Sequence, residues 1–203
     1  MSDRPALLRR ILLTAAGLAV VAFGFAAYEF EAHGPQPTAQ SSLPLGGAFH
    51  LVDQNGRAVS DQDLHGKPTV MFFGYTYCPD VCPTTLTDMT AWLKALGPDA
   101  DRLNMVYVTI DPDRDTPARL KSYLTAFDPR IRGLTGAPQA VAQAAHDYAV
   151  FYQKVPVQGG EYTMDHSTII YLIDAQGHTT DLVQYGTPRD QVVASLKKLL
   201  HPA

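Results

Sequence analysis

Basic residues are too few in this sequence for a nucleic-acid-binding protein. The formal net charge is −4 over 203 residues, and long runs of lysine or arginine are absent. Proteins that hold nucleic acid need a basic surface to neutralise phosphates, so we exclude this class of partner. No internal repeat is visible either. Hydrophobic residues make up 46% of the chain, which suits one globular domain with an appendage.

Cysteine is scarce as well. Cys78 and Cys82 are the only two, and neither lies near the N-terminus, where a lipid could be attached. We therefore expect a membrane anchor to be a helix. A basic segment, residues 1–10, precedes an uncharged apolar stretch, residues 11–28. As a helix this stretch would measure roughly 27 Å, close to the ~30 Å of a bilayer's hydrocarbon core.

The apolar stretch predicts an uncleaved transmembrane anchor rather than a signal peptide. The hydrophobic region of a cleaved signal usually has about 7–15 residues. The best cleavage triplet, Gly24-Phe25-Ala26, lies inside the stretch instead of after it. Basic residues stay on the cytoplasmic side, so we expect residues 1–10 in the cytoplasm. Residues 11–28 then form a single pass through the inner membrane, and the C-terminal domain lies in the oxidising periplasm.

The remaining chain reads as a linker, residues 29–44, and one folded domain, residues 45–203. The linker is rich in Pro, Gln, Ser and Gly. Apolar runs and turn signals predict strands at 49–53, 69–75, 103–110, 168–173 and 180–185, and helices at 83–96, 115–127, 138–149 and 188–200. This order, βαβ and then ββα with helical insertions, predicts an α/β fold with a thioredoxin-like central sheet flanked by helices.

The two cysteines stand four residues apart, just after the apolar strand at 69–75. Open α/β sheets place functional loops at the carboxyl ends of their strands. Cys82 directly precedes a predicted helix, whose free N–H groups favour a thiolate there. A purely structural disulfide is the weaker interpretation, because closing so short a loop contributes only about 2 kcal/mol. The pair is therefore predicted to be redox-active or metal-binding.

Two thiolates suit Cu(I), and one imidazole would complete a trigonal site that lacks the four ligands of structural zinc. Of the seven histidines, His166 is the best placed, since it leads into the strand at 168–173. A lone histidine is by default a surface or core residue, so the position of His166 in the sequence does not by itself show that it is a copper ligand. Met164 would share a face with His166 in an extended segment; a copper relay is one interpretation, and packing is the stronger one.

The segment at 111–117 follows the strand at 103–110 and should lie at the same sheet edge as the cysteines. We expect Thr116 and Pro117 to begin a helix and Arg114 to pair with a neighbouring aspartate, which leaves partner docking as an alternative. Asp80 is a hard oxygen ligand, so we assign it no role in copper coordination.

In four segments the chain resembles the SCO/SenC family of copper chaperones. They are GKP at 66–68 with its approach from Gly56, FGYTYCPDVCP at 73–83, DPDRDTP at 111–117 and DHST at 165–168. The resemblance implies that Cys78, Cys82 and His166 bind copper, as Cu(I) with Cu(II) left open, and that the two cysteines form a redox-active disulfide. It also implies a metallochaperone, not an enzyme, that helps to mature the binuclear copper site of cytochrome c oxidase.

The implied partners are a copper-receiving oxidase subunit, an upstream periplasmic copper donor or thioredoxin-like reductant, and the membrane. A thiol-disulfide reductase that keeps the oxidase cysteines reduced is the main alternative. Reduction has no need of His166, which separates the two hypotheses. A peroxidase is a third interpretation, disfavoured because Asp80 places an acidic group where an activated thiolate needs a basic one.

Overall fold

The structure is a computed structural model that describes residues 44–201. The predicted cytoplasmic segment 1–10, the anchor 11–28 and the linker up to residue 43 lie outside the described residues. Within residues 44–201, no helix has the length and apolar character needed to cross a membrane.

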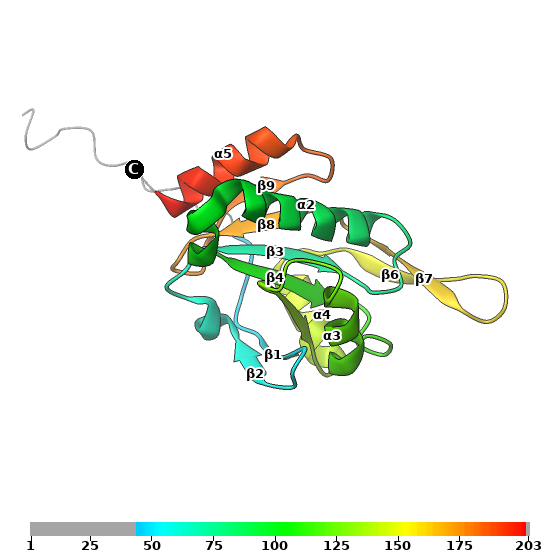
Figure 1. Cartoon of the computed structure of the whole chain (residues 1–203). Coiled ribbons are helices and arrows are strands. Elements are labelled where there is room, and N and C mark those ends of the chain that lie inside the picture. The colour runs from blue at the N-terminus through cyan, green and yellow to red at the C-terminus, as the bar shows by residue number, and fades with distance from the viewer. Residues whose placement is uncertain (1–43, 202–203) are drawn as a thin grey trace, which may run out of the picture. The chain divides into compact units, whose positions relative to one another are not determined.

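A seven-stranded mixed sheet forms the centre of the described residues (Figure 1). Its strand order is β2-β1-β5-β4-β3-β8-β9. The strands are β1 (His50–Asp53), β2 (Ala58–Ser60), β3 (Thr69–Gly74), β4 (Asn104–Thr109), β5 (Ile131–Thr135), β8 (Ile170–Ile173) and β9 (Thr179–Val183). β4 is parallel to β3 and β5, whereas β8 is antiparallel to β3. Every residue of β3 is buried, which confirms the strand predicted from the apolar run.

Helices cover both faces of this sheet. They are α2 (Val81–Leu96), α3 (Pro117–Leu124), α4 (Pro138–Asp147) and α5 (Arg189–Leu200), with short 3₁₀ helices at Asp61–Leu64 and Gly97–Arg102. In Figure 1, α2 and α5 lie side by side on one face, and α3 and α4 lie on the other. The backbone N–H of Arg119 donates to the Thr116 hydroxyl over 3.2 Å, which confirms Thr116 as the cap of α3.

Two strands form a separate hairpin. β6 (Tyr152–Pro156) and β7 (Tyr162–His166) pair with each other and not with the seven-stranded sheet. The expectation that residues 165–167 enter the strand at 168–173 was wrong, because His166 is the last residue of β7 and the buried strand β8 begins at Ile170. The hairpin was not predicted because neither strand has an apolar run and most of their residues are exposed or only partly buried.

The start of α2 and the presence of β5 also differ from the predictions. α2 begins at Val81 and not at Pro83, so Cys82 lies inside its first turn. The strand β5 was missed because Gly133 interrupts its apolar pattern. A Cβ atom on Gly133 would lie 2.7 Å from the Leu124 Cδ1 atom of α3. The glycine therefore permits close packing of α3 on the sheet.

Candidate metal centre

The three residues predicted as copper ligands meet at one end of β3. Cys78 is half-buried in the loop after β3, Cys82 is fully buried in α2, and His166 is half-buried at the end of β7. Their ligand atoms all lie within 4.8 Å of one another. The Nε2 atom of His166 is 3.6 Å from the Cys82 sulfur, across 84 residues of sequence.

The loop that carries Cys78 is held by backbone and side-chain hydrogen bonds. The Cys78 N–H donates to the Tyr75 carbonyl over 3.2 Å, and the Cys82 N–H points at the Cys78 sulfur over 3.4 Å. Thr76 donates from its backbone N–H and its hydroxyl to the buried carboxylate of Asp115, over 2.9 and 2.6 Å. The segment at 111–117 therefore does lie at the same sheet edge as the cysteines, as predicted.

The imidazole of His166 presents the correct nitrogen for a metal. Its Nδ1 atom lies 2.7 Å from the Ser167 carbonyl oxygen. A carbonyl can only accept, so Nδ1 carries the proton and Nε2 keeps its lone pair toward the thiols. The rings of Tyr75 and Phe72 pack beside the imidazole, with centroids at 5.8 and 6.2 Å. These contacts fix both the tautomer and the plane of the ring.

The two thiols have opposite acidities. A hydrogen bond from the Cys82 thiol lowers the pKa of Cys78 to about 3, and the backbone N–H groups of Cys82 and Asp80 add to the effect against the cost of burial. The bond to Cys78 and burial both raise the pKa of Cys82. The expectation of a thiolate at Cys82 was therefore wrong. The contact with Cys78 and burial raise the pKa of Cys82 by more than the N-terminal end of α2 lowers it. The pair therefore holds one thiolate, on Cys78, and one thiol, on Cys82.

Gly74 and Tyr107 form the floor of the site, and sequence analysis identified neither. A Cβ atom on Gly74 would lie 2.7 Å from the Cys82 sulfur and 3.0 Å from the Tyr107 hydroxyl oxygen. That hydroxyl is buried and makes no hydrogen bond within residues 44–201, and burial raises its pKa. The glycine is needed for the close approach of the sulfur to β3.

Two further residues are near the site without belonging to its ligand set. Asp80 is exposed at the start of α2 and is not among the grouped ligand atoms. Met164 is 5% exposed and lines an open groove of about 350 Å³ with Tyr152 and Pro138. This burial supports the packing interpretation of Met164.

Fold and site together define a class of protein: a thioredoxin-like α/β domain with two thiols at the carboxyl end of a central strand and an imidazole facing them. Such a soft donor set fits copper. The SCO1/SenC family profile matches residues 37–201. The chain belongs to the SCO1/SenC family, and the resemblance seen in its sequence is confirmed.

Solved structures and curated relatives agree with this membership. Bradyrhizobium japonicum ScoI with copper bound is 47% identical, with a TM-score of 0.73 over 76% of this chain and 99% of that chain. Yeast Sco1 with copper bound is 35% identical, with a TM-score of 0.74 over 79% of this chain and 91% of that one. An SCO2-like protein of Rickettsia felis is 41% identical over 140 residues, 68% of each chain. The thioredoxin-like α/β fold is thus confirmed.

Proposed function

We propose that this protein is a membrane-anchored metallochaperone that delivers copper to the binuclear copper site of cytochrome c oxidase during its assembly. The observation that carries the proposal is the approach of His166 Nε2 to the thiols of Cys78 and Cys82, within 4.8 Å. Two sulfurs and one imidazole form a soft trigonal set for Cu(I). A dithiol reductase has no use for the imidazole.

Binding and release of copper follow from the acidities and exposures of the ligands. Cys78 is already a thiolate, so capture of Cu(I) requires the loss of only the Cys82 proton. Cys82 is fully buried and Cys78 is half-buried, so an incoming ligand from the client reaches copper from the side of Cys78. The client displaces the protein's ligands one at a time, and no bond of a substrate is broken. The protein is a carrier and not an enzyme.

The anchor confines this exchange to the membrane surface. Residues 11–28 would cross the inner membrane once, with residues 1–10 in the cytoplasm and the copper-binding domain, residues 45–203, in the periplasm. The linker, residues 29–44, would give a flexible reach of roughly 20 Å. A copper-receiving oxidase subunit in the same membrane is a client within that distance. A periplasmic copper donor and a thioredoxin-like reductant would act before the transfer.

Thiol-disulfide exchange is a second candidate function, supported by a separate observation. Neither cysteine is in a disulfide, and the half-buried Cys78 thiolate stands beside the buried Cys82 thiol. Cys78 would attack a client disulfide, and Cys82 would then displace the reduced client, leaving a Cys78–Cys82 disulfide. This redox-active pair would serve reduction of the oxidase subunit's cysteines, and a reductant would restore the dithiol.

The copper content of the oxidase, measured in cells that carry His166→Ala, tests the first function against the second. A copper chaperone requires His166, so the oxidase should lose copper, whereas a reductase should tolerate the change. His146→Ala is the matched control, since the His146 side chain is 84% exposed and outside the ligand group. If the oxidase kept its copper with His166→Ala but lost it with Cys78→Ser, the chaperone hypothesis would be refuted in favour of the reductase.

A further inference from the structure

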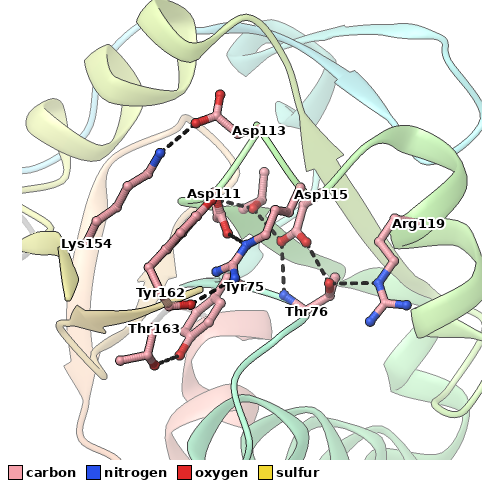
Figure 2. A network of polar contacts seen from close by, with 11 residues as sticks. Tyr75, Thr76, Asp111, Asp113, Asp115, Arg119, Lys154, Tyr162 and Thr163 are labelled. Atoms are coloured by element: carbon pink, nitrogen blue, oxygen red, sulfur yellow. Dashed lines mark hydrogen bonds and ion pairs between the residues drawn. The ribbon is translucent and has the colours of Figure 1, made fainter. Parts of the chain in front are cut away.

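The hairpin that carries His166 is positioned by side-chain contacts and not by backbone pairing with the large sheet. β6 and β7 make no ladder with the seven-stranded sheet, so backbone pairing does not fix the distance from His166 to the thiols. Among the described residues, several side-chain contacts connect the hairpin to neighbouring segments. One hydrogen bond of 2.8 Å joins the hydroxyls of Tyr75 and Thr163. The rings of Phe72 and Tyr75 also pack on His166. Three more hydrogen bonds, made by Tyr162 and Lys154 of the hairpin, lead to a single loop, residues 111–115 (Figure 2).

Arg114 makes the central contact between this loop and the hairpin. Its Nη1 atom donates to the backbone carbonyl of Tyr162 over 2.9 Å, and its Nε atom donates to Asp111 over 2.5 Å. Asp111 in turn accepts from the Tyr162 hydroxyl over 2.7 Å. The Arg114 side chain is 16% exposed and that of Asp111 is fully buried. A closed ring of hydrogen bonds thus ties the hairpin to the loop.

The same guanidinium also touches the cysteine loop. Its central carbon lies 3.6 Å from the ring centroid of Tyr162 and 4.5 Å from that of Tyr77, the residue before Cys78. Arg114 therefore stands between a hairpin residue and a cysteine-loop residue. A planar guanidinium can stack on one ring and hydrogen-bond two oxygens at once, which a lysine ammonium cannot.

The other end of the loop holds the cysteine segment directly. Asp115 is fully buried and accepts from Thr76, and also from the Thr109 hydroxyl over 2.7 Å. Figure 2 shows Asp111 facing Tyr162 and Asp115 facing Thr76 within one short turn of chain. A second contact between the hairpin and this loop, from Lys154 to Asp113 over 2.6 Å, is exposed and contributes little to the position of the hairpin. Both ligand-bearing segments are thus fastened to residues 111–115.

We propose that Arg114 is a positioning residue for the copper site, which sets the distance between the hairpin carrying His166 and the loop carrying Cys78. It does not coordinate copper and acts through His166. The inference rests on the proposed copper site, since a position for His166 matters only if His166 is a ligand. The pairing of Arg114 with a neighbouring aspartate is confirmed, and positioning of the hairpin is the additional role.

The test is an anaerobic Cu(I) competition titration of the protein with Arg114→Lys. This substitution keeps a cation beside Asp111 but removes the planar guanidinium and its paired N–H donors. Loss of a group that orients a metal ligand typically costs 10–100-fold in metal affinity, and we expect a loss of about tenfold. X-ray absorption of the copper complex should show weaker imidazole scattering. Arg130→Lys is the matched control, because Arg130 pairs with Asp128 and Asp101 outside this network, and it should bind as the native protein does.

A double-mutant cycle separates positioning from general stabilisation. If Arg114 acts through His166, Arg114→Lys should have no further effect on Cu(I) affinity in a His166→Ala background. Native affinity and imidazole scattering in Arg114→Lys, or a full effect in the absence of His166, would overturn the inference. Should Arg114→Lys fail to fold, Tyr162→Phe removes only the hydroxyl bond to Asp111, and the same two criteria apply. Failure of the native protein to bind Cu(I) would instead refute the proposed function itself.

Discussion

The backbone N–H of Cys82 points at the sulfur of Cys78 over 3.4 Å. The neighbouring Cys82 side chain lowers the pKa of Cys78, whereas Cys78 and burial raise the pKa of Cys82, so negative charge stays on Cys78 while Cys82 keeps its proton. The charged sulfur is half-buried and the protonated one is inaccessible to solvent. The two cysteines, four positions apart, therefore differ in both reactivity and access.

Alkylation should reveal this difference. With the pKa of Cys78 at about 3, its thiolate is fully formed at pH 5, so iodoacetamide should modify Cys78 of the reduced protein nearly as fast at pH 5 as at pH 7. Cys82 should stay unmodified, because it is buried and its pKa is raised. Peptide mass spectrometry locates the label. In Cys82→Ala the donor is lost, and alkylation at pH 5 should slow at least about tenfold. A native rate that rises about tenfold per pH unit would contradict the assignment.

Gly74→Ala should displace the Cys82 sulfur and weaken Cu(I) binding. The new methyl group would lie 2.7 Å from the Cys82 sulfur and 2.9 Å from the Tyr107 ring, so one of them must shift. Overpacking of this kind typically costs about 1–3 kcal/mol in stability, and Cu(I) affinity should fall about tenfold as the sulfur moves. Urea denaturation and Cu(I) competition measure the two effects.

Gly136→Ala is the control for this substitution. The nearest atom to its added methyl group is the end of the Leu51 side chain, at 3.1 Å, which can give way. Native Cu(I) affinity in Gly74→Ala would contradict this prediction, because it would mean that the added methyl group does not displace the Cys82 sulfur.

The buried carboxyl of Asp115 should make a pH-dependent contribution to stability. Burial, reinforced by the charge of Asp111, raises its folded pKa above the unfolded value of about 3.9, although hydrogen bonds from Thr76 and Thr109 oppose the shift. The folded state thus binds this proton more tightly. The stabilising contribution is complete below the unfolded pKa and is lost as pH rises through the folded pKa. The unfolding free energy of the native protein minus that of Asp115→Asn should therefore decrease from pH 3 to pH 7 in urea denaturation.

Asp128→Asn provides a control of opposite sign. Hydrogen bonds from Arg130 lower the pKa of Asp128, so its contribution is present above the unfolded pKa and is lost as pH falls through the folded one. Its difference from the native protein should increase from pH 3 to pH 7. The same direction of change in both variants would refute the account of Asp115.

Met164→Leu should leave copper binding unchanged. Met164 is 5% exposed, and leucine fills a similar volume at a cost usually below about 1.5 kcal/mol. If Met164 only packs, Cu(I) affinity and the sulfur scattering seen in X-ray absorption should match the native protein. Loss of one sulfur from the copper shell would instead identify the thioether as a ligand.

Much of the fold was readable from local patterns. The apolar run from Thr69 predicted the buried strand β3, and the polar cap at Thr116 predicted the start of α3. Segments without such patterns were missed. β5 is interrupted by Gly133, and the strands β6 and β7, most of whose residues are exposed or only partly buried, have no apolar run. The ligands of the site were predicted through the motif around Cys78 and the resemblance that it supported. The roles of Gly74 and Tyr107 were not predicted, because the close approach of the Cys82 sulfur to β3 cannot be recognised from the spacing of residues in the sequence.

The amino-acid order by itself determined which segments are buried, where the helices begin, and that two thiols stand at the end of a central strand. These properties depend on neighbours in the chain, through the side-chain periodicity of helices and strands and through capping. Only the tertiary structure decided that His166 faces Cys82 across 84 residues and that Cys78 is the thiolate. The first depends on contacts between segments distant in sequence, which form only when the hairpin and the loops have packed together. The second depends on the contact between the two neighbouring cysteines and on the burial of Cys82 in the folded core.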